Sequence, residues 1–150
     1  MKRYILDANV FIQAKNLHYG LDFCPAFWKW LTENNAAGIV FSIEKVGDEI
    51  NAGEDELADW ATQCNENFFL KPDKDILPAL AIVSQWVTRN GYDPAAVNTF
   101  LQVADYYLVG HAVAHKCTIV THEKAAVSKK KIKIPDVCIG LGIKCMPPLS

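Results

Sequence analysis

Four acidic residues occupy positions in the chain where a carboxylate could bind a metal ion. The first, Asp7, directly follows the apolar run Tyr4-Ile5-Leu6, which predicts a short strand buried on both faces. A charge placed there is costly without a partner, and ligands bind open parallel sheets just beyond the carboxyl ends of the strands. Asp7 is therefore either the N-cap of the following helical turn or the first ligand of a site.

The second and third acids, Glu123 and Asp105, also lie where a predicted strand ends or where a predicted helix faces the core. Glu123 lies two residues past the run Thr118–Thr121, another predicted strand, so it occupies a position equivalent to Asp7, with an exposed turn as the alternative. Asp105 lies in the first turn of a predicted helix over 104–116. Its offsets place it on the apolar face of that helix, with Leu108, Val109 and Ala112. The helix dipole favours an acid near the N-terminus, but it does not explain an acid on the buried face.

The fourth acid comes from a helix predicted over 43–51, which has three acidic residues to choose from. Ile43, Val46 and Ile50 define the core face of this helix. At about 100° per residue, Glu49 lies roughly 90° from the centre of that face, Glu44 roughly 130° and Asp48 roughly 170°. We therefore expect Glu49 at the rim of the core, and Glu44 and Asp48 in water.

Four carboxylates at one end of a sheet would repel one another strongly. A pair of unit charges 4 Å apart costs about 4 kcal/mol at an effective dielectric constant near 20. A divalent cation relieves this repulsion, and ligands that are all oxygen favour Mg²⁺ or Mn²⁺ over zinc. The sequence thus predicts a site for Mg²⁺ or Mn²⁺.

Alternation of strands and helices indicates how these acids are positioned. Short apolar runs predict strands at 4–6, 39–41, 118–121 and, as an edge strand, 143–145. Helical patterns fall at 9–15, 25–34, 43–51 (with Ser42 as its cap), 54–65, 73–89, 94–103, 104–116 and 135–141. This order is typical of an α/β protein with a parallel sheet flanked by helices. A length of 150 residues, about half of them apolar, suits one domain over residues 1–150.

Composition narrows the cellular setting and the partners. The five cysteines are odd in number and widely spaced, which argues against a disulfide framework or a zinc cluster and for the cytoplasm. No apolar run approaches the length of a membrane span. Ten acids and three lysines lie between Glu44 and Asp75, whereas seven lysines and two acids follow from Lys116 onward. A basic surface can therefore lie beside an acidic one despite the net charge of −2.

In combination, these motifs resemble the PIN domain, the metal-dependent nuclease fold of VapC-type toxins. The resemblance rests on the segments Ile5–Phe11, Ser42 with Val46 and Glu49-Ile50, Ala104-Asp105 with Ala112, and Ile119–Glu123. The segment around Trp28 and the run Ile132–Pro135 look like a PIN-like subfamily of small proteins often encoded beside an antitoxin. The fold implied is a three-layer α/β/α domain with a short, mostly parallel central sheet.

The resemblance also implies a function. Asp7, Glu49 and Asp105 correspond to the acidic triad of the family, and Glu123 replaces the aspartate that usually provides the fourth acid. The implied activity is a Mg²⁺- or Mn²⁺-dependent endoribonuclease, in which a metal-activated water hydrolyses RNA and leaves a 5′-phosphate and a 3′-hydroxyl. Asn9, Ser42 and Thr121 would orient the ligands. A cognate antitoxin is the implied protein partner, and a homodimer is common in such proteins.

Other residues offer weaker signals. His111 and His115 are four apart on one helix and could ligate zinc, but no third ligand is evident, which favours a structural role. A lysine group follows Glu123, either as a solvated loop or as a contact for RNA phosphates: Lys129, Lys130, Lys131 and Lys133.

Two rival functions remain open. An aspartate after a first parallel strand also marks phosphoaspartyl hydrolases, but these use a second acid two residues later, where this chain has Asn9. The other rival is a PIN-like module that binds RNA or a partner protein without cutting. The presence of all four acids disfavours such a module.

Overall fold

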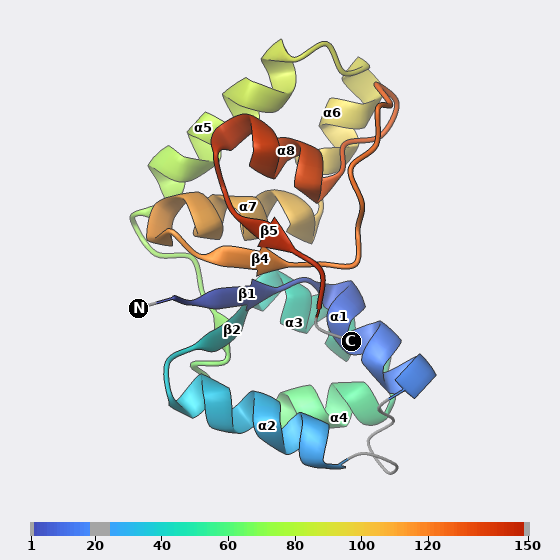
Figure 1. Ribbon diagram of the computed structural model, residues 1–150, viewed down its shortest axis with the longest axis vertical. Helices are drawn as coiled ribbons and strands as arrows, with labels where there is room; N and C mark the ends of the chain where they lie inside the picture. The colour runs from blue at the N-terminus through green and yellow to red at the C-terminus, as the bar shows by residue number, and fades with distance from the viewer. Residues whose placement is uncertain (1, 19–24, 149–150) are drawn as a thin grey trace.

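A five-stranded parallel sheet lies at the centre of the computed structural model, which describes residues 2–18 and 25–148 (Figure 1). Its strands are β1 (Tyr4–Leu6), β2 (Val40–Ile43), β3 (Phe69–Leu70), β4 (Thr118–Val120) and β5 (Cys145–Met146). They are ordered β3-β2-β1-β4-β5, and every neighbouring pair is parallel. With β1 in the middle, the residues that follow β1 and β4 emerge side by side at one edge of the sheet.

Helices flank this sheet and complete an α/β/α arrangement. Figure 1 places α5, α7 and α8 on one side of the strands and α2 and α4 on the other. The described helices are α1 (Ala8–Gln13), the π-helical turn η1 (Ala14–His18), α2 (Pro25–Ala36), α3 (Glu44–Asn51), α4 (Glu56–Gln63), α5 (Ile76–Arg89), α6 (Pro94–Phe100), α7 (Ala104–His115) and α8 (Ile134–Leu141).

The apolar side chains of the central strands form the core. Ile5 of β1 and Ile119 of β4 are fully buried, as are Val46 of α3 and Leu108 of α7. Because both faces of a parallel sheet are covered, its strands are mostly apolar rather than alternating, with Ser42 in β2 and Thr118 in β4 as polar members. The polar residues that follow these strands are therefore brought to the border of the core.

The structure confirms the predicted fold class and most predicted elements. Strand β3 escaped prediction because its two residues have no periodicity of their own and become a strand only by pairing with β2. The prediction that Ser42 caps α3 is wrong. Ser42 lies inside β2, and its Oγ donates a hydrogen bond to the carbonyl oxygen of Leu6 at 2.7 Å, while Ile43 is the N-cap of α3.

Two predictions drawn from composition can be compared with the described residues. Cys64, Cys117, Cys138 and Cys145 are all free thiols, and Cys24 lies outside the described residues. None of the helices in the described parts of the chain has the length and apolar character needed to cross a membrane.

Candidate active site

Asp7 serves both as a helix cap and as part of an acidic cluster. Only 4% of the residue is exposed. One carboxylate oxygen, Oδ1, accepts a hydrogen bond from the main-chain N–H of Ala8, and the other, Oδ2, accepts one from the hydroxyl of Thr121, both at 2.7 Å. Burial raises the pKa of Asp7, the Thr121 bond opposes that rise, and the charge of Glu123 adds to it. The two interpretations of Asp7 from sequence are therefore compatible.

Asp105 has the most perturbed carboxyl group of the cluster. It lies in the first turn of α7, partly buried. Burial raises its pKa from 3.8 to about 7, and the charges of Asp7, Glu123 and Glu49 add to the effect, together with a hydrogen bond to Glu123. Each of the other three predicted acids thus acts on Asp105, so the structure brings all four into one electrostatic group.

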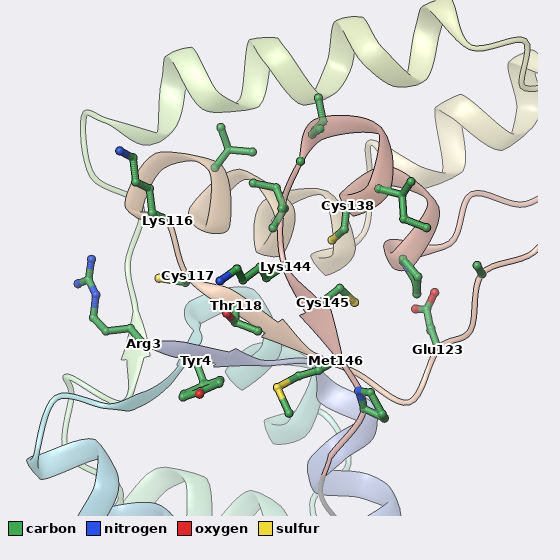
Figure 2. Close-up of a pocket in the computed structure, with 18 of the residues that line it drawn as sticks. Arg3, Tyr4, Lys116, Cys117, Thr118, Glu123, Cys138, Lys144, Cys145 and Met146 are labelled. Carbon is green, nitrogen blue, oxygen red and sulfur yellow. The ribbon is translucent and has the colours of Figure 1, made fainter. Parts of the chain in front are cut away.

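The remaining two acids come from α3 and from the loop after β4. Glu49 is exposed on α3, yet partial desolvation of its carboxyl group and the charge of Asp7 raise the pKa of that group. Glu123 is half-buried, and its Oε1 accepts a hydrogen bond from the main-chain N–H of Ile134 at 3.2 Å. Figure 2 shows Glu123 on the loop after β4, with its carboxylate directed towards the start of α8. This bond holds the longer side chain of Glu123 in place.

The donor set of this cluster fits a hard divalent cation. All its donors are carboxylate oxygens, the ligands that Mg²⁺ and Mn²⁺ prefer. Among the described residues, no three of these four carboxylates place an oxygen each within 4.8 Å of one another, so the cluster is looser than a closed metal cage. The charges of Asp7, Glu49 and Glu123 raise the pKa of Asp105, which reflects a repulsion that a cation would relieve.

Polar residues behind the cluster fix the end of β1 against the end of β4. The amide of Asn9 donates to the hydroxyl of Thr121 at 3.4 Å, and its oxygen accepts from the main-chain N–H of His122 at 3.2 Å. Ser42 contacts the carbonyl of Leu6, next to Asp7 in the chain, rather than a carboxylate. Of the three residues predicted to orient ligands, only Thr121 hydrogen-bonds an acid of the cluster directly.

A cleft of about 510 Å³ opens beside the cluster. It is lined by Glu49 and Asp105 and also by Lys130 and Lys131. A larger groove, of about 1420 Å³, runs past β5 and α8 and includes Glu123 alone of the four acids (Figure 2). We assign the smaller cleft to the candidate site because two acids of the cluster and two lysine side chains line it.

The other two lysines of the predicted group lie elsewhere. The Nζ of Lys129 donates to the carbonyl of Asn90 at 3.0 Å and lies 5.1 Å from the centroid of the Tyr92 ring. Lys133 is the N-cap of α8 and does not line the cleft. Of the four lysines, only Lys130 and Lys131 line the cleft, a distinction that the sequence alone did not make.

One polar group was missed by sequence reasoning. Asp73, Asp75 and His115 bring their ligand atoms within 4.8 Å of one another, at the start of α5 and the end of α7. His115 was a zinc candidate that lacked a third ligand, and the structure supplies two carboxylates from a segment about forty residues away. No local spacing could have paired these residues.

The fold and the acidic cluster define a class: an α/β protein with carboxylates gathered at the carboxyl edge of a parallel sheet. The chain belongs to the family described as a domain of unknown function, DUF4411, which matches residues 4–150. No curated protein matches the chain.

Proposed function

We propose that this chain is a Mg²⁺- or Mn²⁺-dependent endoribonuclease of the PIN type, acting as the toxin of a toxin–antitoxin pair. The observation that carries the proposal is the convergence of Asp7, Glu49 and Glu123 on Asp105 at one edge of the sheet, where the charges of these three acids all raise the pKa of Asp105. These acids come from four separate segments of the chain. The resemblance to PIN domains supplies RNA as the substrate and an antitoxin as the partner.

In this proposal each acid has a distinct task. Asp7, Asp105 and Glu49 would hold the cation, and Glu123 would complete the cluster while the N–H of Ile134 fixes its carboxylate. When bound, Mg²⁺ or Mn²⁺ supplies charge at the scissile phosphate and lowers the pKa of the attacking water. Because the pKa of Asp105 is about 7 without a cation, this carboxyl group is about half protonated at pH 7, and cation binding would release that proton.

The cleft beside the cluster suits a negatively charged strand. Lys130 and Lys131 line it together with Glu49 and Asp105, so phosphates could contact the lysines while one of them reaches the acids. No protein nucleophile is needed in this proposal, because water is the attacking group. The amide of Asn9, which occupies the position of the second acid in phosphoaspartyl hydrolases, is engaged with Thr121 and His122.

The decisive experiment compares cleavage and RNA binding in the parent chain and in Asp7→Asn. Asn keeps the shape of Asp but is a much weaker ligand for a hard cation. We expect the parent to cut total RNA with Mn²⁺ or Mg²⁺ and to stop when EDTA is added. Asp7→Asn should lose cleavage by orders of magnitude, since the metal contributes several kcal/mol and about 1.36 kcal/mol is tenfold in rate.

RNA binding should survive or tighten in Asp7→Asn, because a negative charge near the phosphate is removed. Asp48→Asn is the matched control, since Asp48 is an exposed acid on α3 outside the cluster. Cleavage retained in Asp7→Asn would contradict the metal-nuclease proposal. A parent chain that binds RNA but never cuts it with either cation would instead favour a binding module.

A further inference from the structure

A second group of potential metal ligands lies at the opposite end of the sheet from the acidic cluster. His115 is the last residue of α7, and Asp73 and Asp75 lie in the turn that leads into α5. The Nε2 of His115 is 2.8 Å from the Oδ2 of Asp73. Figure 1 shows the end of α7 and the start of α5 together on the side where β1 begins, whereas Asp7 follows the other end of β1.

The buried side chain of His111 points to a ligand at this group. His111 precedes His115 by one turn on the same face of α7, and their ring centroids are 6.3 Å apart. Only 2% of His111 is exposed, and its Nδ1 has no hydrogen-bond partner among the described residues.

A buried polar nitrogen without a partner is unusual, because such groups cost free energy unless they are satisfied by protein, water or an ion. An ion pair between His115 and Asp73 accounts for two members of the group. A local turn, in which the main-chain N–H of Asp75 donates to the Oδ1 of Asp73 at 3.0 Å, places Asp75 beside Asp73. The ion pair still leaves the Nδ1 of His111, one helical turn before His115, without a partner in the described part of the chain. A metal ion held by this group, with a coordinated water that reaches His111, would satisfy that nitrogen.

We propose that Asp73, Asp75 and His115 form a second metal site, for a transition-metal ion of the zinc class, with His111 supporting it from the buried side. Mixed imidazole and carboxylate ligands suit Zn²⁺ better than Mg²⁺. Bond lengths of about 2.0 Å place the ligand atoms of a tetrahedral zinc about 3.3 Å apart. The ligand atoms of Asp73, Asp75 and His115 lie within 4.8 Å of one another, so small side-chain rotations would bring them to this spacing.

The ion would fasten the turn before α5 to the end of α7, two helices that pack against each other. This role is structural and independent of the proposed nuclease activity. The site lies at the amino edge of the sheet, so its occupancy need not alter the acidic cluster at the other edge. A metal bound only by the folded chain raises the melting temperature.

Zinc binding to the purified chain tests the proposal, with Zn²⁺ alone as the probe. We expect equilibrium dialysis to show one equivalent of zinc more on the parent chain than on His115→Ala or Asp75→Asn. Zinc should raise the melting temperature of the parent chain by more than it raises that of His115→Ala or Asp75→Asn. Both residues are at least partly exposed, so neither substitution should prevent folding, which circular dichroism verifies.

Asp48→Asn controls for the loss of a carboxylate and should bind as much zinc as the parent. His111→Gln should weaken zinc binding by about 10–100-fold, the usual effect of losing a supporting residue. Equal zinc uptake by the parent, His115→Ala and Asp75→Asn would overturn the proposal and leave the group as an ion pair. Unchanged zinc affinity in His111→Gln would remove that residue from the site.

Discussion

The carboxyl group of Asp7 accepts two short hydrogen bonds, yet its pKa is raised. Hydrogen bonds from Ala8 and Thr121 favour the charged form, but burial opposes it more strongly. The fold therefore holds this carboxyl group at a place that disfavours negative charge. A nearby cation would lower the pKa of Asp7 again. A buried acid with a raised pKa is therefore a better indicator of a cation site than an exposed acid.

The hydroxyl of Thr121 provides a direct test of this balance. Thr121→Val removes the hydrogen bond that lowers the pKa of Asp7, so that pKa should rise further. Because the cation binds the ionised carboxylate, the acid limb of the Mn²⁺-binding profile should then move to higher pH. Isothermal titration of Mn²⁺ at several pH values measures this shift.

Thr118→Val is a suitable control for the Thr121 substitution. Thr118 lies in the same strand, β4, but lines the groove beside β5 rather than the cleft of the acidic cluster. Its substitution should leave the Mn²⁺ profile where it is in the parent. If Thr121→Val and the parent chain bind Mn²⁺ with the same pH dependence, the hydroxyl of Thr121 has no role in tuning Asp7.

At the scale of elements, local sequence patterns predicted strands and helices, but not the contacts between elements that are distant in the chain. The ends of β1 and β4 could be placed from apolar runs. Helical periodicity predicted Glu49 at the rim of the core and Glu44 in water, whereas the structure has Glu49 exposed and Glu44 half-buried. Ser42 could not be assigned in this way, because its partner is the Leu6 carbonyl on a neighbouring strand. The meeting of Asp73 with His115 depends likewise on how α5 packs on α7, which no local pattern encodes.

Four of the lysines in the loop between β4 and α8 were candidates for RNA contacts, and they lie in different surroundings. Lys130 and Lys131 are exposed and line the cleft of the acidic cluster, whereas Lys129 contacts Asn90 and the Tyr92 ring. Replacing Lys130 and Lys131 with Ala should weaken RNA binding across sequences. It should also flatten the dependence of log affinity on log salt by about 0.7 for each lost phosphate contact on single strands. Fluorescence anisotropy at several salt concentrations measures both effects.

Lys74 and Lys116 provide the matched control for this double substitution. Both are exposed, and they lie beside the start of α5 and the end of α7, away from the cleft. Their replacement with Ala removes the same total charge, so only the general electrostatic attraction for RNA should change. Equal salt slopes for the two double variants would make the loop lysines merely solvated.

At the scale of the whole molecule, the acidic cluster opposes folding. Its acids come from the end of β1, from α3, from the start of α7 and from the loop after β4. The fold must hold these charges together, whereas the unfolded chain separates them. Much of the repulsion is carried by Asp105, whose pKa is raised by burial and then by the charges of Asp7, Glu123 and Glu49.

This repulsion predicts how the stability of the parent chain depends on pH. The folded chain keeps a proton on Asp105 up to about pH 7, whereas a carboxyl group with the ordinary pKa of 3.8 gives it up far earlier. The folded state therefore binds more protons between about pH 4 and pH 7, so Asp105 makes the free energy of unfolding fall as pH rises through that window. The loss should be on the order of a few kcal/mol, at about 1.36 kcal/mol per pKa unit.

Asp105→Asn should remove this loss, so the variant should match the parent near pH 4 and exceed its stability at pH 8. Urea unfolding of both chains across this range provides the measurement, and the difference between them cancels the titration of other groups. Mn²⁺ should restore the parent at pH 8, by about 2.7 kcal/mol at 100 times its dissociation constant, and should have little effect on Asp105→Asn. A difference between parent and variant that stays constant from pH 4 to pH 8, with equal responses to Mn²⁺, would exclude Asp105 from the cluster.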